Sequence, residues 1–234
     1  MNRWKAFGIH LGISVAVFAA LMAVIIYFWF PGILFSIDGG WNGLKIIMGV
    51  DVVLGPLLTL IVFKPGKKGL KFDLACIAVV QISCLLAGTW IVHGARPLAV
   101  LLAYDTVYSL GAKEFELYGK DPALLEAFPG PYPKLLYSEL PENDISADII
   151  NVRSQFIGDP LFIQTERYRA MPDDVEPVFR RVASVRATAQ TLVGEEAIGV
   201  EGDGCLLSYF VSAYTNGLVC FDGESRKLTR FIPM

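Results

Sequence analysis

The sequence predicts a membrane protein in which three N-terminal transmembrane helices precede a small exported α+β domain with an antiparallel C-terminal β-meander. The chain is 54% hydrophobic and its mean hydropathy is +0.50, values typical of membrane proteins. Its apolar residues gather in three long runs near the N-terminus, whereas the rest of the chain is mixed in composition. We therefore expect a three-helix anchor over residues 1–94 and a separate domain over residues 95–234.

The three apolar runs predict membrane spans at about 6–30, 44–63 and 74–92. Each is close to the roughly 20 residues that a helix needs to cross the hydrocarbon core. The first run follows Arg3 and Lys5, as the core of a signal peptide would, but it is too long for such a core and no Ala-x-Ala site closes it. All three runs are therefore expected to be anchors in contact with the lipid bilayer.

The lysines predict how the spans are oriented. Arg3 and Lys5 precede the first span, and four lysines lie between the second and third, in Lys64-Pro-Gly-Lys-Lys-Gly-Leu-Lys71. Short lysine-rich loops stay in the cytoplasm. We therefore expect a cytoplasmic N-terminus and a C-terminal domain on the opposite side, which in a bacterium is the periplasm. The loop at 31–43, whose only acidic residue is Asp38, is expected on the same side as that domain.

Charge separates the two parts of the chain. Residues 1–94 carry a net charge of +4 and the remainder carries −7. An acidic domain repels phosphate backbones, and no stripe of basic and aromatic residues offsets this. No nucleic-acid partner is expected.

Asp51, Pro56 and Gln81 form the candidate intramembrane interaction site. An ionised carboxylate inside a span costs about 3 kcal/mol, so Asp51 needs a partner, and Gln81 is better placed than His10. Pro56 lacks an N–H group, so we expect a kink in the second span. Asp51 either fixes the register of the helices by hydrogen bonding or pairs with the membrane segment of another protein; transport of protons or ions is a third use.

Small residues recur every four positions in the first span, at Gly8, Gly12, Ala16 and Ala20. Such a stripe lets another helix approach closely. The neighbour is either a helix of the same bundle or one from another protein.

The C-terminal domain is expected to contain both helices and strands. A strand is predicted at 98–108, helices at 122–128, 144–153 and 175–190, and a turn at 201–204. Strands at 206–214, 218–221 and 227–232, joined by turns at Asn216-Gly217 and Asp222-Gly223, predict the C-terminal meander.

Cys205 and Cys220 are candidates for a disulfide because an exported domain is exposed to oxidising conditions. A regular hairpin closed at Asn216-Gly217 would place Ala213 opposite Cys220, so the disulfide would need a bent strand or a bulge. The sequence leaves the pairing open.

Motifs for catalysis, cofactor binding and metal binding are missing from the sequence. Both histidines, His10 and His93, lie in or at the edge of the membrane, and the acidic doublets are typical of solvated loops. We expect a protein that is not an enzyme, with no cofactor and no metal.

The run Asp51-Val-Val-Leu-Gly-Pro-Leu-Leu-Thr-Leu-Ile-Val-Phe63, together with the lysine-rich turn, Gln81 and Arg96-Pro97, resembles type IV pilin accessory proteins of the TfpX/TfpZ type. The resemblance covers about the first 110 residues. It implies a protein of the bacterial inner membrane that acts like a chaperone, modulating pilin stability or pilus assembly. The implied partners are a major or minor type IV pilin and other pilus-assembly proteins.

Two other functions stay open. A membrane-anchored sensor would bind a ligand in its periplasmic domain, although the cytoplasmic parts expected here are too short to hold an output domain. A membrane enzyme or transporter is the other alternative, and Asp51 is the only residue that supports it.

Overall fold

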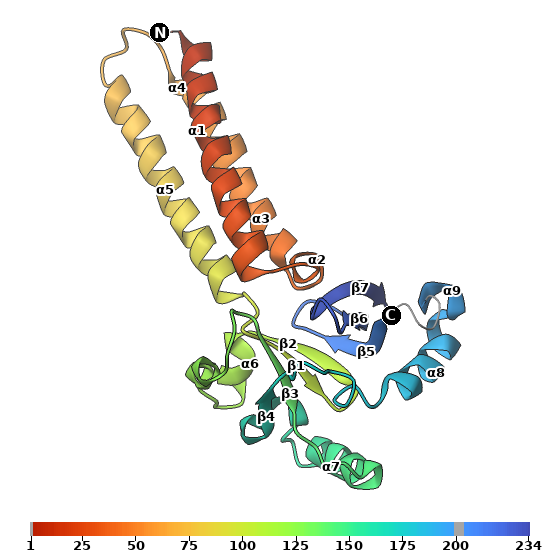
Figure 1. Ribbon diagram of the computed structural model, residues 1–234. Coiled ribbons are helices and arrows are strands. Elements are labelled where there is room, and N and C mark those ends of the chain that lie inside the picture. The colour runs from red at the N-terminus through yellow and green to blue at the C-terminus, as the bar shows by residue number, and fades with distance from the viewer. Residues whose placement is uncertain (1, 199–203) are drawn as a thin grey trace. The chain divides into compact units, whose positions relative to one another are not determined.

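The computed structural model describes residues 2–198 and 204–234, so most of the turn expected at 201–204 lies outside the described residues. The chain forms two compact units (Figure 1). The helical unit comprises Met1–Pro31 and Gly39–Ala95, and the sheet unit comprises Gly32–Asp38 and Arg96–Met234. The loop segment Gly32–Asp38 thus packs with the C-terminal residues rather than with the anchor.

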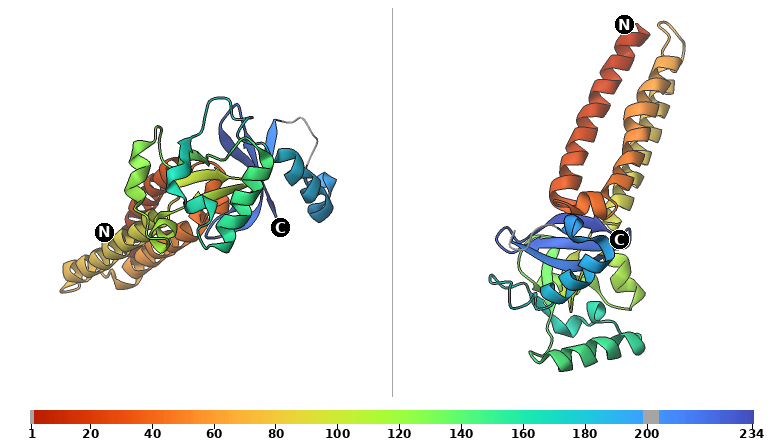
Figure 2. Two further views of the ribbon diagram at one scale, coloured as in Figure 1. Left: turned by 90° about the horizontal axis from the view of Figure 1, so that it is seen from below. Right: turned by 90° about the vertical axis from the view of Figure 1, so that its right-hand side faces the viewer.

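Three helices of the helical unit are long and apolar enough to cross a membrane, which confirms the three predicted spans. The first is α1 (Arg3–Val24), which a π-helical turn extends over Ile25–Trp29, and the third is α5 (Leu70–Gly94). The second consists of α3 (Gly40–Met48), a π-helical turn at Gly49–Leu54 and α4 (Gly55–Val62). These helices run side by side (Figures 1 and 2).

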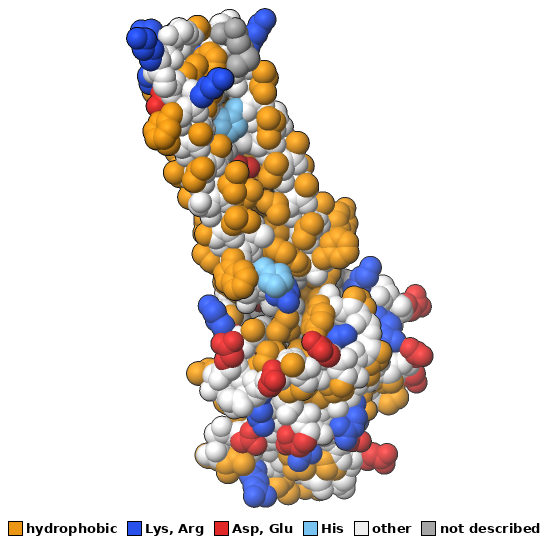
Figure 3. Space-filling view, turned by 90° about the vertical axis from the view of Figure 1, so that its left-hand side faces the viewer, with side chains coloured by type: hydrophobic (Ala, Val, Ile, Leu, Met, Phe, Trp, Pro, Cys, Tyr) orange, Lys and Arg blue, Asp and Glu red, His pale blue; other side chains and the backbone are white. Residues whose placement is uncertain are grey.

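The surface of the helical unit suits a lipid environment. Hydrophobic side chains cover its length, while lysines and arginines gather at the end that carries the N-terminus (Figure 3). At that end the side chain of Asn2 caps α1 by accepting a hydrogen bond from the Lys5 amide, and Lys67 forms an ion pair with Asp73 at the start of α5. The charged turn and the apolar spans are thus segregated along the unit.

The irregularity expected at Pro56 takes the form of the π-helical turn at Gly49–Leu54, which precedes the proline and contains Asp51. A proline ring clashes with the carbonyl of the residue four positions earlier and leaves that carbonyl without its N–H partner. A widened turn is one way in which a helix accommodates this. The proline therefore places Asp51 in an irregular part of the span.

The sheet unit is built on one seven-stranded mixed sheet, in the order β4-β3-β1-β2-β5-β6-β7. Its strands are β1 (Ala99–Ala103), β2 (Thr106–Leu110), β3 (Lys134–Ser138), β4 (Tyr168–Ala170), β5 (Cys205–Val211), β6 (Asn216–Asp222) and β7 (Lys227–Pro233). Two parallel pairings, β1 with β3 and β2 with β5, join the antiparallel pairs into this sheet. The expected α+β fold and antiparallel meander, β5-β6-β7, are confirmed.

Side chains on both faces of the sheet are buried. In β1, Val100 and Leu102 belong to one hydrophobic core, while Ala99, Leu101 and Ala103 belong to the core on the other face. A strand covered on both faces consists of a continuous apolar run. The short helices that complete the unit are α2 (Leu34–Ile37), α6 (Ala112–Leu117), α7 (Asp144–Phe156), α8 (Val182–Val193) and α9 (Glu195–Ile198), with 3₁₀ turns at Pro122–Ala127, Leu161–Ile163 and Thr165–Arg167.

Two elements of the sheet unit differ from their predictions. The single strand predicted at 98–108 is the β1–β2 hairpin, which turns at Tyr104 in a left-handed conformation (φ 62°). The helix predicted from residue 175 begins only at Val182. A separate turn precedes it, in which the amides of Val178 and Phe179 donate hydrogen bonds to the Val175 carbonyl.

The turn predicted at Asn216-Gly217 was wrong, since both residues belong to β6 and pair with Val211 and Phe210. The chain turns earlier, where the Ser212 hydroxyl accepts hydrogen bonds from the amides of Tyr214 and Thr215. Gly217 serves packing instead, because a Cβ atom there would lie 2.4 Å from the Ile232 carbonyl oxygen of β7.

Cys205 and Cys220 are joined by a disulfide that links β5 to β6, with their Cα atoms 5.0 Å apart. They are diagonal neighbours, because Cys205 lies opposite Asp222 and Cys220 lies opposite Leu207. The shift in register lies on the other side of β6, where the pairing with β7 is irregular between Cys220 and Phe221.

Candidate functional site

Asp51 and Gln81 meet inside the helical unit. The Gln81 side-chain amide, on α5, lies 2.7 Å from Asp51 Oδ1 and 3.0 Å from the Asp51 backbone oxygen. It also lies 3.2 Å from the Ser14 hydroxyl of α1. The glutamine therefore ties all three spans together at one level.

His10 joins this cluster through Gln81, although its position near the start of α1 made it the less favoured partner of Asp51. Its Nε2 atom lies 2.9 Å from Gln81 Oε1, and its Nδ1 atom lies 2.5 Å from the Thr59 hydroxyl of α4. We call His10, Ser14, Asp51, Thr59 and Gln81 the polar cluster.

The hydrogen bonds of the polar cluster have a direction. An amide carbonyl only accepts, so His10 Nε2 must donate to Gln81 Oε1, and in the neutral imidazole Nδ1 then accepts from Thr59. The Gln81 amide group donates in turn towards Asp51 and Ser14. The series of hydrogen bonds thus runs from Thr59 through His10 to Gln81, and Asp51 is its final acceptor.

Asp51 is left incompletely bonded. Its side chain is only 6% exposed, and its second carboxyl oxygen, Oδ2, is buried without a hydrogen-bond partner among the described residues. Leaving such a group unsatisfied costs about 1–3 kcal/mol. Among the described residues, the polar cluster therefore contains one carboxyl oxygen, Asp51 Oδ2, that receives no hydrogen bond.

Gly55 makes room for this arrangement. A Cβ atom at Gly55 would lie 2.2 Å from the Gln81 amide nitrogen and 2.5 Å from its oxygen. The Gly55-Pro56 pair thus has two effects, since the proline disrupts the helix next to Asp51 and the glycine lets Gln81 reach it. Gly55, His10, Ser14 and Thr59 were not among the predicted site residues; the spacing of four between His10 and Ser14, which puts both on one helical face, was the available signal.

The polar cluster lies in a groove of about 400 Å³ between α1 and α5, both of which pack against the second span. Its remaining lining is apolar: Ala6, Ile9, Ile13 and Val17 from α1, Phe63, and Leu74, Ala78, Ile82 and Leu85 from α5. The groove is thus apolar along its length except where the polar cluster lines it.

The small-residue stripe is exposed. Gly8, Gly12, Ala16 and Ala20 all lie on the surface of the helical unit, and a Cβ atom at Gly8 or Gly12 would meet nothing within 4 Å. Packing of this stripe inside the bundle is therefore excluded for the described residues. Close packing between spans occurs instead at Gly43, where a Cβ atom would lie 2.3 Å from Val92.

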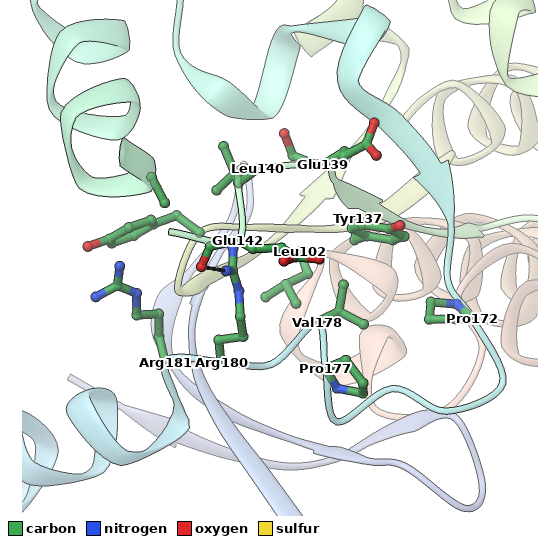
Figure 4. A pocket seen from close by; sticks show the side chains of 13 residues that line it. Leu102, Tyr137, Glu139, Leu140, Glu142, Pro172, Pro177, Val178, Arg180 and Arg181 are labelled. Atoms are coloured by element: carbon green, nitrogen blue, oxygen red, sulfur yellow. Dashed lines mark hydrogen bonds between the residues drawn. The ribbon is translucent and has the colours of Figure 1, made fainter. Parts of the chain in front are cut away.

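The sheet unit contains a separate cavity of about 520 Å³ at the carboxyl ends of β1 and β3 (Figure 4). Leu102 and Tyr137 line it together with Pro172, Pro177 and Val178 from the chain after β4. Arg180 borders it and donates hydrogen bonds to the main-chain oxygens of Pro141 and Glu142, at 2.9 and 2.7 Å. The hydroxyl of Ser138, also in the lining, is buried without a partner in the described part of the chain.

Asp38, expected as a loop residue, is a second buried carboxyl group. It is 5% exposed, and the Ser109 hydroxyl donates a 2.5 Å hydrogen bond to it. Burial raises the pKa of Asp38 to about 6, although hydrogen bonds from Ser109 and Ser212 act in the opposite direction; the nearby charge of Glu114 adds to the increase. This group changes its charge close to neutral pH.

The chain is similar to three proteins of Dichelobacter nodosus that are named fimbrial assembly proteins. It is 34% identical over 130 residues to those of serogroup I and serogroup E1, and this match covers 55% of the chain but 51% of each relative. It therefore spans about half the length of these two relatives. It is 35% identical over 105 residues to the protein of serogroups C1 and C2, covering 44% of the chain and 80% of that relative. No protein-family model and no solved structure matches the chain.

Proposed function

This chain belongs to the family of fimbrial assembly proteins, and we propose that it is an accessory protein that acts on type IV pilin in the membrane before assembly. In this role it stabilises the pilin subunit as a chaperone would. The family agrees with the resemblance of Asp51–Phe63 to pilus-assembly accessory proteins.

The observation that carries the proposal is the groove between α1 and α5 with the polar cluster in it. A plain membrane anchor needs no binding groove and no buried carboxylate, which is costly within a bilayer. A pilin that waits in the membrane offers an apolar helix for the groove and a globular head for the sheet unit. Other pilus-assembly proteins are further partners.

The proposed location is the bacterial inner membrane. The distribution of lysines supports a cytoplasmic N-terminus and a periplasmic sheet unit, and a disulfide between Cys205 and Cys220 suits the oxidising periplasm. We propose a role without catalysis.

Deleting the gene tests this function. Total pilin and surface fimbriae should both fall, and a plasmid copy should restore both. If pilin turnover accounts for the loss, pulse labelling will show faster degradation of pilin in the deletion strain. Unchanged pilin and unchanged fimbriae would contradict the proposal.

A second candidate function is a sensor that binds a ligand in the sheet unit, and the cavity beside Ser138 and Arg180 favours it. Its polar and apolar lining is typical of small-molecule sites. Replacing Val178 by Trp would fill this cavity without touching the polar cluster. Loss of a ligand-dependent response with normal pilin levels would favour the sensor.

A further inference from the structure

The groove between α1 and α5 has the dimensions of a helix-binding site. Its two walls extend over residues 6–17 of α1 and 74–85 of α5, each about 18 Å long at the helical rise of 1.5 Å per residue. The side chains along its rim are open to the surroundings, with Ile9 56%, Ile13 60% and Ile82 57% exposed. An elongated apolar partner can therefore enter from the side, within the plane of the membrane.

Asp51 restricts what that partner is. Among the described residues, the Gln81 amide is the one donor to the Asp51 side chain: it occupies Oδ1 and leaves Oδ2 without a partner. In the carboxylate form of Asp51, Oδ2 is an acceptor that lacks a donor. Lipid acyl chains carry no donor, so a groove filled by lipid leaves Asp51 unsatisfied.

We propose that the groove receives the apolar membrane helix of the pilin subunit, and that one hydrogen-bond donor on that helix bonds to Asp51 Oδ2. This inference rests on the proposed function and adds the chemistry by which the partner is recognised.

A second copy of this chain is the competing occupant. Its α5 helix carries an exposed hydroxyl at Ser83, which is also a donor. The experiment must therefore distinguish pilin from a second copy.

The test is photocrosslinking of the full chain in living cells that produce pilin. A photoreactive amino acid is placed at Ile13 or Ile82 in the groove and, as a control, at Ile61 on α4, which is 78% exposed and is not part of the groove lining. Antibodies against pilin and against the chain itself identify the product. A pilin product at Ile13 and Ile82 but not at Ile61 supports the proposal. Equal yields at all three positions, or a product that contains two copies of the chain, would overturn it.

The role of Asp51 is tested with two substitutions, each made in the protein that carries the photoreactive amino acid at Ile13 or Ile82. Asp51→Leu removes both carboxyl oxygens at similar volume, and Asp51→Asn keeps one oxygen for Gln81 but places an NH2 donor where Oδ2 lay. Interhelical hydrogen bonds in membranes are worth a factor of about three on average, so the leucine variant should lower the pilin product at least about threefold. The asparagine variant should lower it as well, because a donor at this position does not accept the partner's hydrogen bond. Equal yields from wild type and Asp51→Leu would exclude the hydrogen bond.

The donor is located by replacing each polar residue of the pilin helix in turn with an apolar one. One replacement should lower the crosslink as Asp51→Leu does and should have no further effect in the leucine background. If no position couples to Asp51 in this way, the proposed pairing is wrong.

The gene deletion separates this inference from the function on which it rests. Pilin that is lost on deletion but never crosslinks to the groove overturns the helix site and leaves the accessory role intact. Pilin and fimbriae that are normal on deletion overturn both.

Discussion

Gln81 holds the three spans together because one side chain reaches groups on each of them. Its bonds to Ser14, to Asp51 and to His10 all require the side chain to lie over Gly55, where there is no Cβ atom. The glycine and the glutamine therefore depend on one another. This dependence can be measured without reference to any partner protein.

We predict that Gly55→Ala displaces Gln81 and disrupts the polar cluster. The new Cβ atom would overlap the side-chain amide, and the loss of its buried hydrogen bonds should cost about 1–3 kcal/mol. The free energy of unfolding of the detergent-solubilised protein checks this. Gly49→Ala is the matched control, since Gly49 belongs to the same span and a Cβ atom there meets nothing within 4 Å.

A double-mutant cycle completes this test. If Gly55→Ala acts by displacing Gln81, it should have little further effect in a Gln81→Ala background. Additive effects of the two substitutions would show that Gly55 matters for another reason.

Asp38 gives a prediction about pH. Its pKa is raised from 3.8 in the unfolded chain to about 6 in the folded sheet unit, so folding favours the protonated form. The stabilisation is complete below the unfolded pKa and is lost as the pH rises through about 6. The loss amounts to about 3 kcal/mol at 1.36 kcal/mol per pKa unit.

Asp38→Asn should remove this dependence, because an amide does not titrate. Thermal unfolding of the sheet unit at pH 5 and pH 8 should therefore show a smaller difference for the variant than for the wild type. The same pH dependence in both proteins would assign it to other groups. The neighbour Glu114 is checked separately with Glu114→Gln.

The sequence predicted the pairing of Asp51 with Gln81, but it did not predict most of the polar cluster. A buried carboxylate in a span is conspicuous from composition alone, since it must have a partner. His10, Ser14 and Thr59 are moderately polar residues that membrane helices often contain. Their roles depend on how the three helices are rotated, and a single sequence does not specify that rotation.

Small residues allow close packing between the spans of the helical unit. Gly43 of α3 lies against Val92 of α5, and Gly88 of α5 lies 3.3 Å from Ile47 as measured from an ideal Cβ position. The regular spacing of the small-residue stripe in α1 predicted close approach of another helix, yet the stripe is exposed. Spacing shows that close approach is feasible, but not which helix approaches.

We predict that Gly43→Ala destabilises the packing of α3 against α5. Its Cβ atom would lie 2.3 Å from a Val92 methyl group, and overpacking of this kind costs about 1–3 kcal/mol. Adding Val92→Ala should restore much of the stability, because it removes the clashing methyl groups. Resistance of the purified protein to unfolding in detergent measures both effects. A double variant no more stable than Gly43→Ala alone would argue against the contact.

In the sheet unit, too, the sequence pattern did not show how the elements pack against one another. Period and turn residues predicted the C-terminal strands, but Asn216-Gly217, a common hairpin turn, lies within β6 because the contact with β7 requires a glycine. The hairpin at β1 and β2 was missed because its turn, Tyr104-Asp105, lacks the glycine that short hairpin turns favour. Tertiary packing decided the first case.

At the scale of the whole molecule, the sheet unit includes a segment from within the anchor region of the sequence, Gly32–Asp38, in addition to the C-terminal residues. The connection between the first two spans contributes Leu34 and Ile37, 4% and 8% exposed, to the core of the sheet unit beside Val100 and Phe210. The sequence showed this segment only as a short loop with one acid. Its apolar residues carried no period that would reveal a distant partner.

We predict that the sheet unit depends on this segment for its stability. Leu34→Ala in the full chain should destabilise the sheet unit by about 2–5 kcal/mol, as expected for a buried leucine, while Ser36→Ala should have little effect because Ser36 is exposed. Hydrogen exchange locates the change, since amides of β1 and β2 should lose protection while those of α5 keep theirs. Loss of protection in α5 as well would mean that the two units unfold together. Unchanged exchange in the strands would mean that the segment contributes no stability to their core, and a fragment of residues 96–234 would then be a complete folding unit.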